Sequence, residues 1–359
     1  MARPTQAKLD LGALRHNVSV ARKLAPHSKL MAVVKANAYG HGAATIAAAL
    51  QPNVDALAVA SLEEAAALRD LGITLPILLL EGIFEASELG IAAQLEVWLS
   101  IHNEQQLQWL EDATLSAPLP CWLKIDTGMN RLGVTPASAL QHYQRLMATP
   151  NAADNIVTYT HFASADDVHN QQTQRQIAVF DDLPFSAARS AANSAALLAW
   201  PLAHYDWVRP GYMLYGNSPM AQNHPNAQTL KPVMSLTSAV IALHDVAVGE
   251  SVGYGGTWVA QRPSVIATVT VGYGDGYPRE APNGTPVLVN GQRATLAGRV
   301  SMDMITVDVT DIQNVQRGAE VVLWGAGLPL GEVARWANTI GYELTTRMPQ
   351  RTPRVVVNA

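Results

Sequence analysis

The sequence predicts an α/β protein, with an N-terminal (β/α)8 barrel over residues 9–230 and a mostly β domain over residues 231–359. Two observations support this fold class. Short apolar runs alternate with helical patterns eight times, which is typical of consecutive βα units. From Pro232 onward, strand-like runs follow one another with only short turns rich in Gly and Pro between them.

The first predicted barrel strand, residues 30–34, is a continuous apolar run, as expected for a strand buried on both faces of a parallel sheet. Helical patterns such as residues 62–71 and 103–112 separate the later strands. Those strands are predicted at residues 55–60, 77–81, 96–100, 121–126, 156–161, 187–190 (the weakest pattern) and 206–209.

The second domain is predicted to begin near residue 230, after the polar stretch 222–228. Only residues 331–340 have a helical pattern in this region. Its strands are predicted at residues 234–243, 264–271, 285–289, 304–309 and 320–323.

Composition excludes several classes of protein. A chain of 359 residues with 48% hydrophobic and 15% charged residues is typical of a globular protein with a large core. The net charge of -5 and the lack of a dense basic run argue against nucleic acid as a partner. No stretch resembles a membrane span or a secretion signal, so we expect a cytoplasmic protein. Cys121 is the only cysteine, which excludes an internal disulfide, and no metal site is predicted.

Polar and charged side chains follow the predicted barrel strands at their C-terminal ends, where barrel enzymes carry their active sites. Lys35 follows the first strand, and its amine could serve imine chemistry if it lies in a cavity, or could extend over the barrel rim into solvent. The other residues of this set are Lys124, Arg131, His161, Asn193, Ser194 and Arg209.

Three segments carry a family resemblance that extends over nearly the whole chain. They are AVVKANAYGHG (residues 32–42), LKIDTGMNRLG (123–133) and RPGYMLYG (209–216). With them the sequence resembles the alanine racemases, which use pyridoxal phosphate and supply D-alanine for peptidoglycan. The resemblance implies that Lys35 carries the cofactor, that Tyr39 lies close to it, and that residues 1–8 form a strand of the second domain.

The same resemblance implies roles for the other barrel residues. Arg131 would approach the phenolic oxygen of the cofactor and help to position the substrate. Arg209 would donate to the pyridine nitrogen, and His161 would orient Arg209. Lys124 matches a lysine that is often carbamylated in the family, although an ordinary ion pair with Asp126 is an equal alternative. The cofactor phosphate would be held by Ser194, Tyr39, Tyr342 and the backbone near Gly211 and Tyr212, and Asn193 would be a further cofactor-binding residue.

The second domain contains three further segments of the family pattern: VGYGGTW (252–258), VGYGDGYPRE (271–280) and GRVSMDM (298–304). Tyrosine in such turns most often serves packing. By resemblance, however, these segments reach into the other subunit of a head-to-tail homodimer. Tyr254 would be a second catalytic base opposite the partner's Lys35, because racemisation needs a base on each face of the substrate. Met302 and Asp303 would contact the substrate, and Tyr273, Tyr277 and Arg279 would line the entrance.

Two residues depart from the family pattern: Thr346 replaces a common cysteine, and Ser164 replaces a common asparagine.

Some alternative functions remain open. A non-catalytic cofactor carrier would lack the β domain and Tyr254. A decarboxylase of basic amino acids would place a carboxylate where Arg209 stands and would need a catalytic cysteine, whereas Cys121 lies within a predicted strand. A serine racemase or a racemase of broad specificity is a closer alternative.

Overall fold

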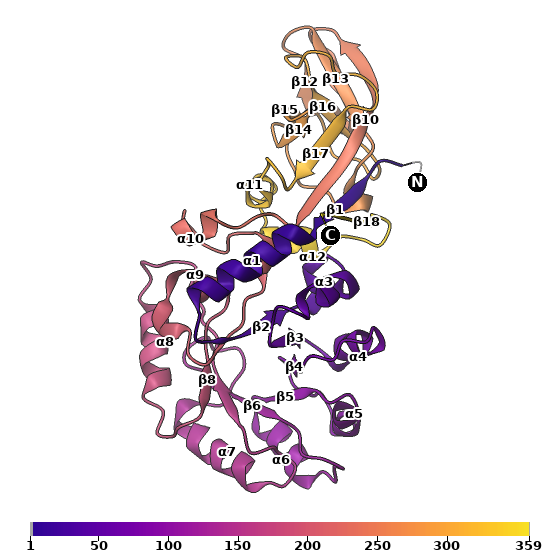
Figure 1. Cartoon of the computed structure of the whole chain (residues 1–359). Helices are drawn as coiled ribbons and strands as arrows, with labels where there is room; N and C mark the ends of the chain where they lie inside the picture. Colours follow the sequence, from indigo (N-terminus) through magenta and orange to yellow (C-terminus); the bar gives the residue numbers. More distant parts are fainter. Residues whose placement is uncertain (1–2, 359) are drawn as a thin grey trace.

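The alternating apolar runs form a closed parallel barrel in the computed structural model, which describes residues 3–358 (Figure 1). Neighbouring strands pair in chain order, and the last strand returns to the first through Lys29 opposite Trp207. The predicted barrel is therefore confirmed. Its strands are β2 (Lys29–Val33), β3 (Ala56–Val59), β4 (Ile77–Leu79), β5 (Trp98–Ile101), β6 (Cys121–Lys124), β7 (Val157–Tyr159), β8 (Ala188–Ser190) and β9 (Trp207–Val208).

Helices cover the outside of the barrel and bury the outward-facing residues of the strands. In β2, for example, Leu30 and Ala32 pack in the core between strands and helices, whereas Met31 and Val33 pack inside the barrel. This alternation is the two-residue period of a strand. The helices are α1 (Leu11–Leu24), α3 (Ala43–Leu50), α4 (Leu62–Asp70), α5 (Glu88–Gln94), α6 (Glu104–Asp112), α7 (Pro136–Ala148), α8 (Gln172–Asp181), α9 (Ser194–Ala199) and α10 (Pro225–Gln228), with 3-10 turns η1 (Pro201–Ala203) and η2 (Tyr212–Tyr215).

The second domain is built on a mostly antiparallel sheet in the order β13-β16-β15-β14-β17-β10-β1-β18, which closes on itself because β13 also pairs with β10. The first and last strands of the chain, β1 and β18, lie side by side in parallel. The strands are β1 (Gln6–Asp10), β10 (Met234–Val246), β13 (Ser264–Val269), β14 (Pro286–Val289), β15 (Gln292–Leu296), β16 (Ile305–Asp308), β17 (Glu320–Trp324) and β18 (Arg354–Val357).

Several smaller elements of this domain were not predicted. The predicted helix over residues 331–340 is wrong in its extent: α11 (Leu330–Trp336) ends early, and Asn338 adopts a left-handed φ of 52° that no continuing helix allows. A second helix, α12 (Gly341–Thr346), follows it. The remaining elements are β11 (Ser251–Val252), β12 (Trp258–Val259), η3 (Tyr254–Gly256) and η4 (Tyr273–Asp275).

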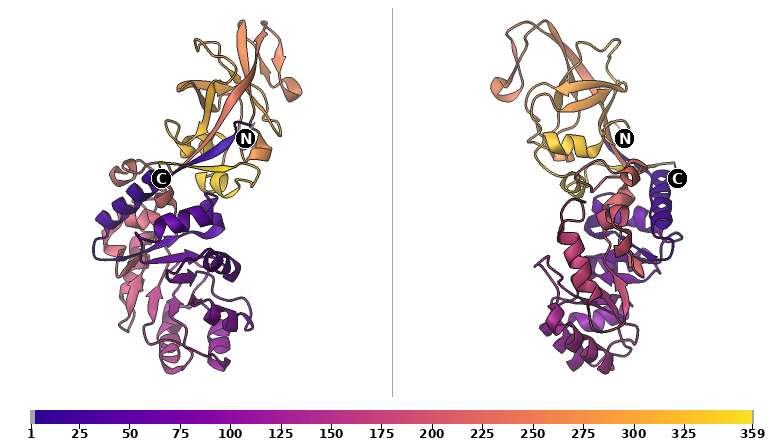
Figure 2. Two further views of the ribbon diagram at one scale, coloured as in Figure 1. Left: turned by 45° about the vertical axis from the view of Figure 1, so that its right-hand side comes forward. Right: turned by 90° about the vertical axis from the view of Figure 1, so that its left-hand side faces the viewer.

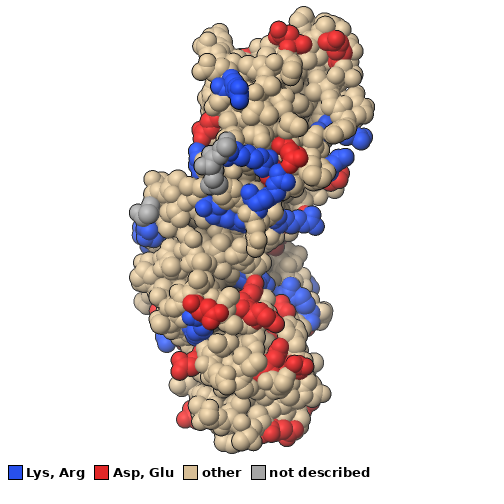
Figure 3. Space-filling view, turned by 90° about the vertical axis from the view of Figure 1, so that its right-hand side faces the viewer, with Lys and Arg blue, Asp and Glu red and all other residues tan. Residues whose placement is uncertain are grey.

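The two domains meet at the C-terminal end of the barrel (Figure 2). Helix α12 packs against α2 (Lys35–Tyr39), the segment that follows β2. Next to this contact, Arg354 of β18 donates to the carbonyl oxygen of Gly40 at 2.9 Å. Figure 3 shows many basic side chains around this junction. Within residues 3–358, no helix is both long and apolar enough to span a bilayer.

Candidate active site

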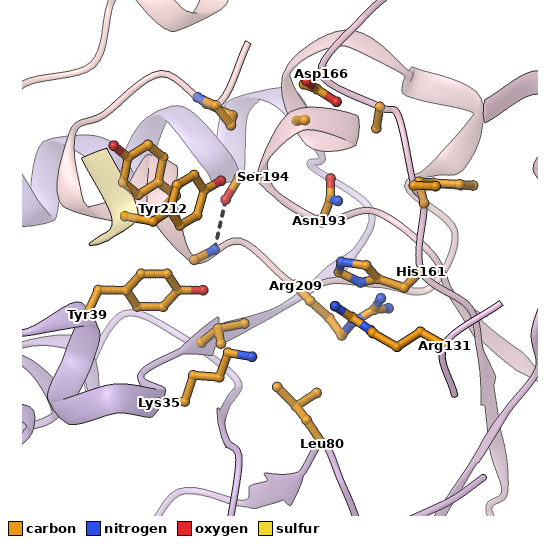
Figure 4. A pocket seen from close by; sticks show the side chains of 18 of the residues that line it. Lys35, Tyr39, Leu80, Arg131, His161, Asp166, Asn193, Ser194, Arg209 and Tyr212 are labelled. Carbon is orange, nitrogen blue, oxygen red and sulfur yellow. Dashed lines mark hydrogen bonds between the residues drawn. The ribbon is translucent and has the colours of Figure 1, made fainter. Parts of the chain in front are cut away.

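A cavity of about 810 Å³ lies above the C-terminal ends of the barrel strands (Figure 4). Residues from both domains line it, since Ile340, Tyr342 and Thr346 come from the second domain. The cavity brings together most of the predicted site residues: Lys35, Tyr39, Lys124, Arg131, His161, Asn193, Ser194, Arg209, Gly211, Tyr212 and Tyr342.

Strand periodicity explains why these side chains point inward. Trp122 and Trp207 face the barrel interior, and the residues two positions later, Lys124 and Arg209, lie on the same strand face. Lys35 follows inward-facing Val33 in the same way. Lys35 is half-buried, and its amine points into the cavity rather than over the rim (Figure 4).

The backbone after Lys35 forms one turn of left-handed helix. Ala36 to Tyr39 all have φ between 51° and 54°, a conformation that costs roughly 1–2 kcal/mol per residue with a side chain. Side chains hold the turn at both ends: Glu64 accepts from the Ala36 N–H at 2.6 Å, and the His41 Nδ1 atom lies 3.0 Å from the Tyr39 carbonyl oxygen. The strained turn fixes Lys35 and Tyr39 on opposite ends of one rigid segment.

Arg209 is buried without a carboxylate partner among the described residues. Its guanidinium donates to Ser190 Oγ at 2.5 Å and to the Thr160 carbonyl oxygen at 2.6 Å, and it lies over the Tyr159 ring at 5.1 Å. Burial lowers the pKa of Arg209 to about 10, so that the group stays charged at neutral pH. The fixed neighbours determine the direction in which Arg209 can donate to a ligand.

Lys124 completes a cluster of positive charges. Burial, and after it the charge of Arg209, lower the pKa of Lys124 to about 8. Lys124 and Asp126 form no close ion pair in this conformation, although the charge of Asp126 partly offsets the lowering of the Lys124 pKa. Asp126 Oδ1 instead accepts the backbone N–H groups of residues 128, 129 and 130.

His161 and Tyr159 lie next to this cluster. Burial and the charge of Arg209 hold the pKa of His161 well below its usual value, so its imidazole is neutral. Figure 4 shows His161 beside Arg209 and Arg131. Tyr159 was not predicted as a site residue, yet its ring lies 5.6 Å from Lys124 Nζ, and its hydroxyl contacts Ser100 Oγ at 2.5 Å. Tyr159 lies two residues before His161, and residues two positions apart on a strand share a face, so this spacing could have indicated that Tyr159 belongs to the site.

The opposite end of the cavity is rich in hydroxyl groups. Ser194 Oγ accepts from the backbone N–H groups of Gly211 at 2.9 Å and Met213 at 3.2 Å. Gly211 is required here, because a Cβ atom would lie 2.5 Å from the Tyr39 hydroxyl oxygen. The Gly211 N–H thus donates to Ser194 Oγ in this conformation.

Aromatic rings close this end. Tyr342 of α12 stacks on Tyr212 with ring centroids 3.6 Å apart. Burial raises the pKa of Tyr39 to about 12, so its hydroxyl stays protonated and can donate. Asn193 lines the cavity and also caps α9, where its Oδ1 accepts from the Ala196 N–H at 3.0 Å. Thr346, the departure from the family pattern, also lines the cavity and donates to the Tyr342 carbonyl oxygen.

Apart from Tyr342, the predicted site residues of the second domain do not line this cavity. Tyr254 is 71% exposed, Met302 is 52% exposed, and Tyr273, Asp303 and Arg279 are also exposed. The prediction for Tyr277 is wrong: it is 1% exposed and its ring stacks on Trp324 in the domain core, so it cannot line an entrance.

No group of three or more His, Cys, Asp and Glu side chains within residues 3–358 is arranged to hold a metal ion. The free thiol of Cys121 is buried in β6, and burial raises its pKa to about 12. The cavity therefore offers an amine, a buried guanidinium, neutral imidazole and a cluster of hydroxyl groups. Such a set suits an anionic ligand with a carbonyl group that can react with an amine.

Comparison with known proteins identifies the family. Residues 9–219 match the model "Alanine racemase, N-terminal domain", and residues 233–356 match "Alanine racemase, C-terminal domain". The biosynthetic alanine racemase of Pseudomonas aeruginosa is 51% identical over 98% of this chain and 99% of its own length. An alanine racemase of Chromohalobacter salexigens is 50% identical over 100% of this chain and 99% of its own length.

Solved structures agree with this match. The crystal structure of the Pseudomonas aeruginosa enzyme superposes with a TM-score of 0.94 at 50% identity, covering 99% of each chain. The alanine racemase of Bartonella henselae, a structure with covalently bound pyridoxal phosphate, gives a TM-score of 0.87 at 31% identity, again covering 99% of each chain. The chain therefore belongs to the alanine racemase family, a family of isomerases.

Proposed function

We propose that this enzyme interconverts L-alanine and D-alanine with pyridoxal phosphate, using a base from each of two subunits. The observation that carries the proposal is the presence of both Lys35 and Arg209 in one cavity. Both residues follow inward-facing strand positions at the C-terminal end of the barrel. The hydroxyl groups around Ser194 line the same cavity. The identity to alanine racemases over the whole chain supports the substrate.

The cavity fits this cofactor in three places. Lys35 supplies the amine that would bind the aldehyde carbon. Ser194, Tyr39 and Tyr342, together with the backbone N–H of Tyr212, would hold the phosphate, since that N–H has no acceptor in the described chain. Arg209 would lie at the ring nitrogen, with Arg131 near the phenolic oxygen. The cofactor, when bound, withdraws electrons from the substrate Cα and makes its proton removable.

Arg209 sets the electronic limit on that chemistry. A guanidinium donates hydrogen bonds and cannot accept them, so Arg209 would keep the ring nitrogen unprotonated. By withholding a proton from that nitrogen, Arg209 would limit how strongly a bound cofactor withdraws electrons, which would favour return of the α-proton over side reactions. Neutral His161 beside Arg209 adds no charge to the cluster and would orient the guanidinium.

Proton transfer would be divided between two chains. Lys35 would take or return the α-proton on one face of the substrate, and Tyr254 of the partner subunit would act on the other. The exposure of Tyr254, Tyr273 and Met302 in the single chain supports this division, because large apolar side chains gathered on one domain mark an interaction surface. Asp303 would offer its backbone N–H to the substrate carboxylate, and Tyr273 and Arg279 would line the entrance.

Lys124 is proposed to be carbamylated. An amine whose pKa is about 8 is partly unprotonated at neutral pH and can attack carbon dioxide, losing a proton to form an anionic carbamate. That anion would pair with Arg131. It would also bring a negative charge into the cluster around Arg209, which has no carboxylate partner among the described residues. We expect bicarbonate at pH 8 to raise the Tm of the enzyme, whereas the Lys124→Met variant should show no such shift.

The shared site can be tested by mixing inactive chains. Lys35→Ala and Tyr254→Phe chains should regain activity when they exchange, because one site of the mixed dimer then holds both bases. No activity despite demonstrated chain exchange would contradict the proposal. Reduction with borohydride should attach the cofactor to the peptide that contains Lys35, a result that does not depend on activity.

Substrate breadth is decided by direct comparison. Turnover of alanine should exceed that of serine, lysine and arginine measured side by side. A preference for serine, or similar rates with all four, would replace alanine racemisation by the serine or broad-specificity alternative.

A further inference from the structure

A buried carboxylate in the second domain holds the turn that carries Tyr273. Asp275 is fully buried, and its two carboxylate oxygens accept from Arg3 Nη1 at 2.5 Å and Arg3 Nη2 at 2.7 Å. Arg351 Nε lies 2.9 Å from the same carboxylate, and the Gly272 N–H donates to it at 2.9 Å. Every oxygen of this buried anion is thus matched by donors, as its burial requires.

The same two arginines also hold the loop that carries Met302 and Asp303. Arg351 Nη2 donates to Asp303 Oδ1 at 2.6 Å, and Arg3 Nη2 donates to the Asp303 carbonyl oxygen at 3.3 Å. Arg3 and Arg351 therefore each contact both loops.

Backbone hydrogen bonds join the two loops directly. The Tyr273 N–H donates to the Ser301 carbonyl oxygen at 3.0 Å, and the Gly274 N–H donates to the Met302 carbonyl oxygen at 2.9 Å. The contact is so close that a Cβ atom at Gly272 would lie 2.3 Å from the Ser301 carbonyl oxygen. A displacement of one loop must therefore move the other.

The two arginines come from opposite ends of the chain. Arg3 precedes β1 and Arg351 precedes β18, and the parallel pairing of these strands brings the two side chains together. Neither arginine lines the cavity of its own chain. The two positive charges are balanced by Asp275 and Asp303, so the cluster is not an anion site. The contacts of the cluster instead fix the positions of the two loops.

We propose that Arg3, acting with Arg351 through Asp275, is a positioning residue for the active site of the partner subunit. It would fix the distance and orientation at which the loops of Tyr273 and of Met302 and Asp303 meet the substrate held by the other chain. This inference rests on the proposed function, because it requires that these loops serve the partner. It assigns to the N-terminal segment a role in substrate binding on the other subunit.

Mixed dimers test this assignment, because the same substitution can be placed on either chain. One chain carries Lys35→Ala and supplies the loops of the single working site. The other chain carries Tyr254→Phe and supplies its Lys35. Arg3→Met is added to the first chain in one mixture and to the second chain in another, so both mixtures contain the same set of substitutions.

Arg3→Met on the chain that supplies the loops should lower kcat/KM for alanine by roughly 3- to 30-fold, the range of indirect couplings between residues, mainly through a higher KM. The same substitution on the other chain should change kcat/KM by less than about twofold. Lys8→Met is the matched control on the loop-supplying chain, because Lys8 lies on β1 and pairs with exposed Glu320, away from both loops. Arg3→Lys keeps the charge but loses the bidentate contact, so its kcat/KM should lie between those of Arg3→Met and the parent.

Equal effects from both placements, or no effect from either, would overturn the inference while leaving the proposed function intact. A parent mixture without the Arg3 substitution that shows no activity despite chain exchange would overturn the proposed function and this inference together. Should Arg3→Met chains fail to fold, the two placements of Arg3→Lys give the same comparison.

Discussion

The two ends of the barrel are built from the same strands and have opposite chemistry. At the N-terminal end, Trp98, Trp122 and Trp207 pack against one another with ring centroids 5.6 to 6.0 Å apart. At the C-terminal end, two residues further along β6 and just beyond β9, stand Lys124 and Arg209. A second cavity, of about 630 Å³, lies at the aromatic end. The same strand faces thus supply a packed aromatic floor and a cationic site.

This difference shows how a barrel separates stability from chemistry. The aromatic rings bury large areas without unmatched charge, so they support folding. The cations above them lie close together, and burial disfavours their charged forms, as the lowered pKa values of Lys124 and Arg209 show. We infer that packing at the aromatic end stabilises the fold and offsets the destabilisation caused by burying like charges at the cationic end. Substitutions at the two ends should therefore have separable effects.

The largest expected effect is on activity at the cationic end. Lys35→Ala should reduce racemisation by at least about 10⁴-fold, the upper end of what a positioned base contributes, because it removes both the cofactor amine and a base. Lys29, at the other end of β2, is the matched control, and Lys29→Met should keep the wild-type rate. Assays of both variants at saturating cofactor measure this contrast; a similar loss in the two variants would contradict the separation.

The next largest effect is on stability at the aromatic end. Trp207→Ala removes a ring that is 6% exposed and contacts two other indoles, so unfolding should become easier by about 3–5 kcal/mol. Denaturant unfolding measures this change. The kcat of the molecules that remain folded should stay within a few-fold of wild type. A large loss of kcat with unchanged stability would show that the aromatic end takes part in the chemistry.

Stability should also depend on pH through His41, which braces the left-handed turn after Lys35. Burial lowers the pKa of His41 to about 4, whereas the unfolded chain has the ordinary value near 6.5. Between these values the unfolded state binds more protons at His41, so the His41 contribution to the free energy of unfolding falls as the pH falls from about 6.5 to 4, and this contribution is constant above 6.5.

The expected loss from His41 is about 3 kcal/mol, from the difference of roughly two and a half pKa units. His41→Gln should show a flatter profile of unfolding free energy over this window. Because His161 shifts in the same direction, only the difference between variant and wild type isolates His41. Parallel profiles would mean that folding leaves the pKa of His41 unchanged.

The barrel could be predicted from the sequence because each strand is a short apolar run that contacts its neighbours in chain order. The small elements of the second domain could not. α12 contains Gly341 and two threonines, which are poor helix formers, and packing against the first domain holds it in place. Three of the five residues of β15 are polar and exposed, and β18 is a run of three valines after Arg354 in which no residue is fully buried, so neither strand shows the usual alternation of apolar and polar residues.

The site was predictable where strand ends and family segments coincide, as for Lys35, Lys124 and Arg209. Tyr159 was missed because tyrosine within a strand usually serves packing, and only the neighbouring cations give it another role. The left-handed turn after Lys35 could not be predicted, because alanine avoids that conformation unless tertiary contacts impose it. Tyr277 was misassigned because spacing alone does not distinguish an entrance from a core.

The smallest effect concerns Lys29, a cation that lies over the aromatic floor formed by Trp98, Trp122 and Trp207. Lys29 Nζ lies 5.1 Å from the centre of the Trp207 ring, and the lysine is exposed, so their interaction should contribute about 0.5–1 kcal/mol. A double-mutant cycle measures it: Lys29→Met should cost this amount in the wild type and nothing in a Trp207→Leu background. A coupling near zero would show that Lys29 rests on the ring without stabilising it. A change in KM for alanine in Lys29→Met would be more serious, because it would mean that the second cavity communicates with the first and that the two ends of the barrel are not independent.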